Sequence, residues 1–188
     1  MAVSFVPNTP LPQGQTLVDP AAGLAAHRQS LAAFESAANR VQSAQWNQPR
    51  APEKWSPGQV VEHLRMTYEV VGGELDGKPG LTVRSPWWIR PLLRFKFLRK
   101  ILSEGAVPPG AKAPRELHPG PGPYDRDQTL AALNLAAERF EATLTRRWND
   151  PAAGVTHHVF GRLSAPDMLR FATVHLDHHA RQFPQSDA

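Results

Sequence analysis

The last part of the chain carries the stretch that decides the fold, SAPDMLRFATVHLDHHARQF, residues 164–183. Apolar side chains recur in it every three or four residues, which is the period of a helix with one buried face. Ser164 stands at the expected N-cap, and Asp167 follows three residues later, as in a capping box. The segment therefore predicts a helix from Ala165 to about Phe183 whose apolar face is turned toward a core.

Segments upstream show the same period and similar start signals. Asp19-Pro20 and Ser56-Pro57 each place proline in the first turn behind a capping side chain. The helices expected there span 21–45, 57 to the glycines at 72–77, 87–103 (short, aromatic and bent near Pro91) and 127–148, the last capped by Asp127. Four long amphipathic helices and one short one predict an all-α fold, an antiparallel four-helix bundle.

Proline and glycine mark the expected connections. Residues 108–123 hold six prolines and three glycines and predict a long loop that covers a site or moves. A second loop is expected at 149–162. We expect an extended arm at 1–18, one helical domain at 19–184 and a short tail at 185–188.

Composition restricts the classes of protein and of site. The 188 residues amount to about one domain. No apolar run reaches the roughly 18 residues that cross a bilayer, and the N-terminus does not resemble a signal peptide, so we expect a cytoplasmic protein with no membrane partner. There is no cysteine, which excludes disulfides, thiolate ligands and a cysteine nucleophile. A transition metal would be held by histidine and carboxylate, which suit zinc, nickel, manganese or iron.

The net charge of +4 is concentrated between Arg84 and Lys100. A basic segment that also holds Trp87 and Trp88 is a candidate nucleic-acid footprint. The simpler interpretation is a solvated helix face whose aromatic residues pack on the bundle or form the subunit interface of a homodimer.

Two histidines of the last predicted helix, His175 and His179, are four residues apart and lie about 40° from each other on one face. Met168, Leu176 and Phe183 share that side, so both imidazoles point toward the interior. Two imidazoles one turn apart can converge on one ion at about 2.0–2.1 Å. The alternative is a pair of histidines hydrogen-bonded beside the core, and this spacing alone does not decide between the two.

A third histidine, His63, lies beside the apolar stripe that Val60, Leu64 and Val71 form on the second predicted helix. In an antiparallel bundle that helix can face the last one. One ligand from one helix and two from another is a usual way to build a metal site in a bundle core. His63, His175 and His179 are therefore a candidate site for a divalent metal ion.

These stretches resemble a known family. WSPGQVVEHL, residues 55–64, resembles the second-helix signature of the DinB-like superfamily, and HLDHHARQF, residues 175–183, resembles its last-helix signature. HHVFGRLS, residues 157–164, resembles a loop found in one branch of unknown function. The resemblance runs in order through about residues 20 to 184.

The resemblance implies a bundle of DinB type with one divalent metal ion held by three histidines. By position, His63 matches the second-helix ligand, and His175 and His179 match the last-helix pair. His157 matches the loop histidine of the branch, where most members have proline at the position of His158. That departure leaves open which of the two neighbours, if either, reaches the site.

Other side chains near the predicted ligands are weaker candidates for lining the site. His178 lies on the shoulder of the apolar face, where a surface position is the simpler interpretation. Thr67 and Tyr68 follow His63 by about one turn, and core packing is their alternative role. Glu62 is adjacent to His63 and points elsewhere, which weakens it as a general base. The sequence names no catalytic residue.

Three protein ligands leave a coordination position for water or a substrate, so the first hypothesis is a metal-dependent enzyme acting on a small molecule. It would be a hydrolase, or an S-transferase or isomerase that activates a low-molecular-weight thiol. The resemblance supports both, and the missing carboxylate base slightly favours the thiol. The alternative is a non-catalytic stress-response or binding module stabilised by its metal. Nucleic-acid binding is the weakest of the three.

Overall fold

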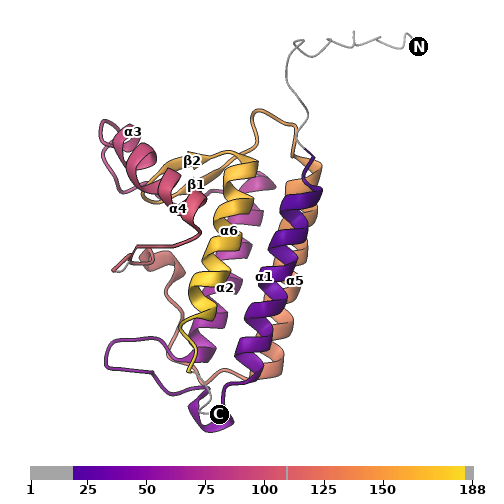
Figure 1. Ribbon diagram of the computed structural model, residues 1–188, viewed down its shortest axis with the longest axis vertical. Helices are drawn as coiled ribbons and strands as arrows, with labels where there is room; N and C mark the ends of the chain where they lie inside the picture. Colours follow the sequence, from indigo (N-terminus) through magenta and orange to yellow (C-terminus); the bar gives the residue numbers. More distant parts are fainter. Residues whose placement is uncertain (1–18, 109, 185–188) are drawn as a thin grey trace, which may run out of the picture.

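The computed structural model describes residues 19–108 and 110–184. This part of the chain is mostly helical, as expected. Four long helices lie side by side (Figure 1): α1 (Ala21–Asn39), α2 (Pro57–Leu75), α5 (Arg126–Arg146) and α6 (Ala165–Ala180). None of the described helices has the length and apolar character needed to cross a membrane. The arm expected at 1–18 and the tail at 185–188 lie outside the described residues.

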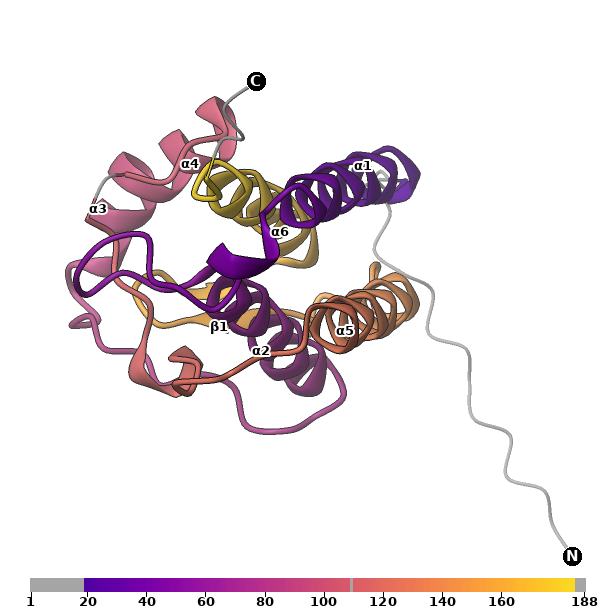
Figure 2. The same cartoon turned by 90° about the horizontal axis from the view of Figure 1, so that it is seen from below.

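The long helices form two layers. α1 packs against α6, and α2 packs against α5, as Figure 2 shows in a view along the helices. The core is built from large apolar side chains without exposed surface, among them Phe34, Leu133, Phe140, Leu144 and Leu176. Burial of each such side chain stabilises the fold by about 1.5–3 kcal/mol.

Two helix starts are confirmed by their caps. The hydroxyl of Ser56 accepts a hydrogen bond from the backbone N–H of Gln59, whose side chain accepts one from the N–H of Ser56. The hydroxyl of Ser164 likewise accepts from the N–H of Asp167. These caps fix the starts of α2 and α6, the two helices that carry the predicted metal ligands.

The predicted end of the first helix is wrong, because α1 ends at Asn39 and not near residue 45. The chain turns so that Val41 and Trp46 are both buried, with a short 3₁₀ turn, η1 (Ser43–Gln45), between them. Arg126 donates a hydrogen bond of 2.6 Å to the Val41 carbonyl. Burial of the Trp46 side chain thus overrides the helical propensity of residues 40–45.

The predicted cap of α5 is wrong by two positions. Asp125, and not Asp127, precedes the helix, and its carboxylate accepts from the backbone N–H of Gln128 at 2.9 Å. Both aspartates satisfy the sequence rule. A contact outside the helix favours Asp125 as the cap. The side chain of Asn47 accepts a hydrogen bond of 2.8 Å from the backbone N–H of Tyr124 and fixes the turn just before Asp125.

A small antiparallel sheet lies where a loop was expected. β1 (Val155–His157) pairs with β2 (Gly161–Leu163). Val155 and Leu163 are buried, and the Glu74 carboxylate of α2 accepts hydrogen bonds from Thr156. Strands of three residues are too short for an alternating pattern to be recognised in the sequence. The fold is therefore mostly helical, as expected, but it also contains this hairpin, which the sequence did not predict.

The short aromatic helix begins at Arg90, three residues after its predicted start. It comprises α3 (Arg90–Leu93), a π-helical turn, η2 (Arg94–Leu98), and α4 (Arg99–Glu104). Pro91 occupies its first turn, where the missing N–H is not needed. The loop that follows contains a 3₁₀ turn, η3 (Arg115–Leu117).

A buried polar network joins α1, α5 and α2. Nδ1 of His27 lies 2.7 Å from a carboxylate oxygen of Glu141, and its Nε2 lies 2.6 Å from the Tyr68 hydroxyl. Burial raises the pKa of the Glu141 carboxyl, but hydrogen bonds from His27 and Arg28 outweigh it, and the net pKa is lowered. Burial raises the pKa of Tyr68 well above its usual value. The Tyr68 hydroxyl therefore keeps its proton and donates a hydrogen bond to Nε2 of His27.

The variant Tyr68→Phe removes this hydroxyl and leaves Nε2 of His27 without its donor. Because an unsatisfied buried polar atom costs about 1–3 kcal/mol, we expect the free energy of unfolding in urea to fall by that amount. Tyr124→Phe is the matched control, because the Tyr124 hydroxyl bonds to the Gly120 carbonyl at the surface. An equal loss in the two variants would contradict the role given to the buried network.

Candidate metal centre

Three histidines meet where the start of α2 lies beside the end of α6. The candidate ligand atoms of His63, His175 and His179 all lie within 4.8 Å of one another. Nε2 of His175 lies 3.4 Å from Nε2 of His63 and 2.9 Å from Nε2 of His179. The chain thus brings residues more than a hundred positions apart into one cluster.

The two measured separations suit ligands of a single ion. Nitrogen atoms about 2.0–2.1 Å from one metal are about 2.9 Å apart at a right angle and about 3.3 Å apart at the tetrahedral angle. The Nε2 separations of 2.9 and 3.4 Å match these two values. The separations of His175 from its two neighbours are therefore compatible with a shared ion.

The outer nitrogens of two rings are held by hydrogen bonds. Nδ1 of His63 donates to the backbone carbonyl of Leu117 at 2.8 Å. Nδ1 of His179 donates to Oε1 of Gln182 at 3.0 Å. A ring that donates from Nδ1 presents the lone pair of Nε2, which is how metal-binding histidines are usually oriented.

Hydrogen bonding alone does not satisfy the three facing nitrogens. His63 and His179, neutral and protonated on Nδ1, both present Nε2 lone pairs toward His175. A proton on Nε2 of His175 can serve only one of them. A divalent ion accepts all three lone pairs when His175 carries its proton on Nδ1. The donor set therefore fits a divalent metal better than a closed cluster of hydrogen-bonded histidines.

The electrostatics of the cluster favour neutral imidazoles. Burial lowers the pKa of His63 to about 4, although its bond to Leu117 opposes the shift. Burial, with neighbouring histidines adding to it, lowers the pKa values of His175 and His179 well below 6.5. Neutral imidazole is the form that binds a metal, so the cluster is ready for coordination at pH 7.

Aromatic rings enclose the cluster on two sides. The ring of Trp55 lies 4.7 Å from that of His63, and the ring of Phe171 lies 6.0 Å from that of His175. His63 and His179 are buried, whereas His175 keeps partial exposure. Apolar rings thus lie beside His63 and His175, and His175 is the least buried of the three histidines.

The hairpin histidines lie outside the cluster of ligand atoms. Nδ1 of His157 accepts hydrogen bonds from the backbone N–H groups of Val159 and Phe160, so His157 closes the turn between the strands. Its ring lies 4.9 Å from that of Phe171, and burial lowers its pKa to about 3. His158 stacks on it and is half-buried. His157 is therefore a neighbour of the site's aromatic wall.

The other side chains weighed as site-lining residues have contacts of their own. Nε2 of His178 accepts a hydrogen bond of 2.9 Å from the Gln182 amide. The Thr67 hydroxyl donates to the backbone carbonyl of His63 at 2.8 Å. Tyr68 belongs to the buried network described above. Thr67 is thus bonded to the backbone of His63, and His178 is connected to His179 through Gln182.

Sequence reasoning missed three groups around the ligands, namely Leu117, Gln182 and Trp55. Gln182 lies three residues beyond His179, a spacing visible in the sequence. Trp55 immediately precedes the cap of α2, so its place beside His63 could also have been inferred. The Leu117 carbonyl carries no side-chain signal, and its contact depends on the path of the long loop.

Gln182 offers a test of this orientation. Gln182→Leu removes the acceptor that holds Nδ1 of His179, so we expect metal affinity to fall by about 10–100-fold without loss of a ligand. The affinity is measured by zinc titration against a chromophoric chelator. Gln182→Glu keeps an acceptor for His179 and is expected to bind close to wild type. Equal affinities in wild type and Gln182→Leu would show that the amide has no such role.

The chain matches a known protein family in sequence. The sequence model of the DinB superfamily matches residues 26–183, a range that contains all three clustered histidines. No curated protein and no solved structure matches the chain significantly.

Proposed function

The chain belongs to the DinB superfamily, and on this premise we propose that it binds one divalent metal ion through Nε2 of His63, His175 and His179. The observation that carries the proposal is the convergence of three neutral imidazoles, two of them oriented by outer hydrogen bonds. The four long helices would then be the antiparallel bundle of DinB type, with residues 19–184 as one domain.

We further propose that the protein is a metal-dependent enzyme acting on a small molecule. An ion held by three imidazoles keeps a coordination position for an outside ligand and lowers the pKa of the group bound there. Zinc, nickel and iron suit imidazole ligands, whereas manganese prefers the oxygen ligands that this cluster lacks. Partial exposure of His175 supports access from solvent, and Trp55 and Phe171 supply apolar walls against which a substrate can pack.

The charges near the cluster favour thiol activation over hydrolysis. Both carboxylate oxygens of Glu62, the residue next to His63, accept hydrogen bonds of 2.7 Å from Arg65. Among the described residues the cluster itself contains no carboxylate. A metal lowers the pKa of bound water as well as that of a bound thiol, but many hydrolases also use a carboxylate base, whereas a metal-bound thiol releases its proton to solvent without one. An S-transferase or isomerase that uses a low-molecular-weight thiol is therefore our preferred reaction class.

The test begins with metal-free protein exposed separately to zinc, nickel, manganese and iron(II). We expect one ion per chain by metal analysis after desalting. Loaded protein is then assayed with thiols plus electrophilic acceptors, and in parallel with esters and amides. Absence of stoichiometric metal would end the proposal, and ester or amide cleavage without thiol would replace the preferred reaction by hydrolysis. Bound metal without turnover would favour a non-catalytic, metal-stabilised module.

A further inference from the structure

The segment from Trp87 to Glu104 exposes a group of large apolar side chains. Five of them, which we call the aromatic surface, are between 41% and 77% exposed: Trp87, Trp88, Leu92, Phe95 and Phe97. Among the described residues only Leu135, on α5, is a comparable exposed hydrophobic side chain. So many neighbouring apolar groups are unusual on a surface without a partner.

The segment is held firmly in place, so its exposure is not that of a loose loop. Leu98 and Ile101 are buried, and α4 packs against α6. Arg94 donates hydrogen bonds to the carbonyls of Phe160 and Arg162 in the hairpin. Figures 1 and 2 show the segment on the outer side of the molecule, beside α6. Leu92, Phe95 and Phe97 are thus presented by an anchored helix, and Trp87 and Trp88 lie in the turn just before it.

Cations predominate around the aromatic surface. Residues 77–103 contain no Asp or Glu, whereas they hold seven Lys and Arg residues. Three of these cations bind the protein itself: Arg84 pairs with Glu116, and Arg90 and Arg94 donate to backbone carbonyls. Lys96, Arg99 and Lys100, on the helix itself, are exposed, and Lys100 lies 3.8 Å from Glu104. The seventh cation, Lys78, is exposed just after α2.

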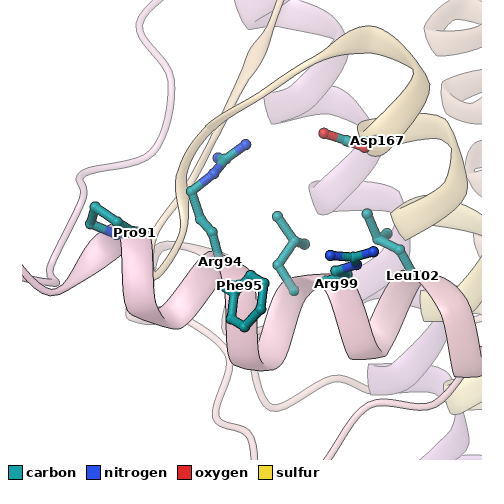
Figure 3. A pocket seen from close by; sticks show the side chains of 7 residues that line it. Pro91, Arg94, Phe95, Arg99, Leu102 and Asp167 are labelled. Atoms are coloured by element: carbon teal, nitrogen blue, oxygen red, sulfur yellow. The ribbon is translucent and has the colours of Figure 1, made fainter.

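A hollow of about 550 Å³ adjoins the aromatic surface (Figure 3). Phe95, Leu98 and Leu102 contribute apolar lining, and Arg99 and Asp167 contribute charged groups. None of the residues that line this hollow belongs to the histidine cluster. The surface therefore offers an apolar recess beside exposed cations, separate from the candidate metal centre.

We propose that the aromatic surface docks the protein onto anionic lipid bilayers. Trp, Phe and Leu interleaved with Lys and Arg are the side chains that settle at a bilayer interface, where rings enter the headgroup layer and cations meet lipid phosphates. Such a contact is peripheral and needs no spanning helix. The proposal departs from the expectation, drawn from the sequence, of no membrane partner.

The observations favour a bilayer over the other occupants. A second copy seated symmetrically on this surface would bring its cations against those of the first, and residues 77–103 supply no carboxylate to pair with them. A nucleic acid would need a track of free cations along its phosphates. Here five apolar side chains accompany only three outward cations, which fits an amphipathic interface better.

The test uses the full chain with vesicles of phosphatidylcholine alone and with phosphatidylserine added. Sedimentation measures bound protein, and tryptophan emission reports entry of Trp87 and Trp88 into the interface. We expect binding to anionic vesicles more than about tenfold tighter than to neutral ones, falling as salt is raised. The double variants Trp87→Ser/Phe95→Ser and Lys96→Glu/Arg99→Glu are each expected to weaken binding at least about tenfold.

Leu135→Ser and Arg139→Glu, both exposed on α5, are the matched controls and should bind as wild type does. Thermal unfolding confirms that each variant is folded. If the Trp87→Ser/Phe95→Ser variant does not fold, the Lys96→Glu/Arg99→Glu variant still tests the proposal. Failure of wild type to sediment with anionic vesicles would overturn the proposal. So would a concentration-dependent dimer abolished by the same variants, or a DNA duplex that binds as tightly as the vesicles and competes with them.

Discussion

The variant His175→Ala is expected to lose stoichiometric metal binding, with affinity falling by more than about 100-fold. Nε2 of His175 lies within 3.4 Å of Nε2 of both His63 and His179. Removal of this imidazole leaves only two candidate ligands, one on α2 and one on α6. Loss of a hydrogen bond that only orients a ligand lowers metal affinity by about 10–100-fold, and loss of a ligand itself should lower it further. Metal analysis and chelator competition measure the change.

Folding stability gives an independent reading of the same loss. A metal present at about a thousand times its dissociation constant stabilises the fold by about 4 kcal/mol. Wild type should therefore melt at a higher temperature with metal, whereas His175→Ala should not respond. His118→Ala is the matched control, because His118 is exposed and its Nε2 bonds the Ala113 carbonyl at 3.1 Å. A metal-dependent rise of equal size in wild type and His175→Ala would refute the three-histidine site.

The sequence was sufficient for the features that depend on local patterning. Apolar periodicity marks all four long helices, and the caps at Ser56 and Ser164 can be read from residue type and spacing alone. The convergence of His63 with the last-helix pair followed from helix faces and a family resemblance. Each of these inferences uses interactions within one helix or between two regular ones.

Features that depend on packing between distant segments could not be predicted. Burial of Trp46 ends α1 early, and Asn47 selects the cap of α5 through Tyr124. The hairpin is too short to show a strand period. At the site, the bond from His63 to the Leu117 carbonyl depends on a proline-rich loop whose course no local rule specifies. The clustering of the three histidines was therefore predictable, and so was Gln182 from its spacing, whereas the contact of His63 with the Leu117 carbonyl was not.

The metal-free protein is expected to lose stability steeply as the pH falls from about 6.5 toward 4. Burial holds the pKa of His63 near 4 and that of His157 near 3, and it lowers those of His175 and His179 well below 6.5. An unfolded histidine titrates near 6.5, so between these limits the unfolded chain binds more protons than the folded one. Stability is then complete above pH 6.5 and is lost as acid protonates the unfolded state first.

The size of this effect follows from the linkage. A shift from 6.5 to about 4 corresponds to about 3 kcal/mol for His63 alone. Glu141 acts in the same direction in more acid solution, because its lowered pKa gives stability that disappears when the carboxylate is protonated. Urea unfolding of metal-free protein at a series of pH values measures the slope. That slope is set by the number of protons bound on unfolding. His157→Leu should lower this number by up to one while leaving the three clustered histidines in place.

A bound metal should change this pH dependence in a way that hydrogen-bonded histidines cannot reproduce. The ion and the proton compete for Nε2 of His63, His175 and His179, so saturating zinc is expected to move the loss of stability to lower pH. His157 is outside the cluster, and its contribution should be insensitive to zinc. Identical unfolding profiles with and without zinc would mean that the three imidazoles are only a polar part of the core. A zinc-dependent displacement that disappears in His175→Ala would identify them as ligands of one ion.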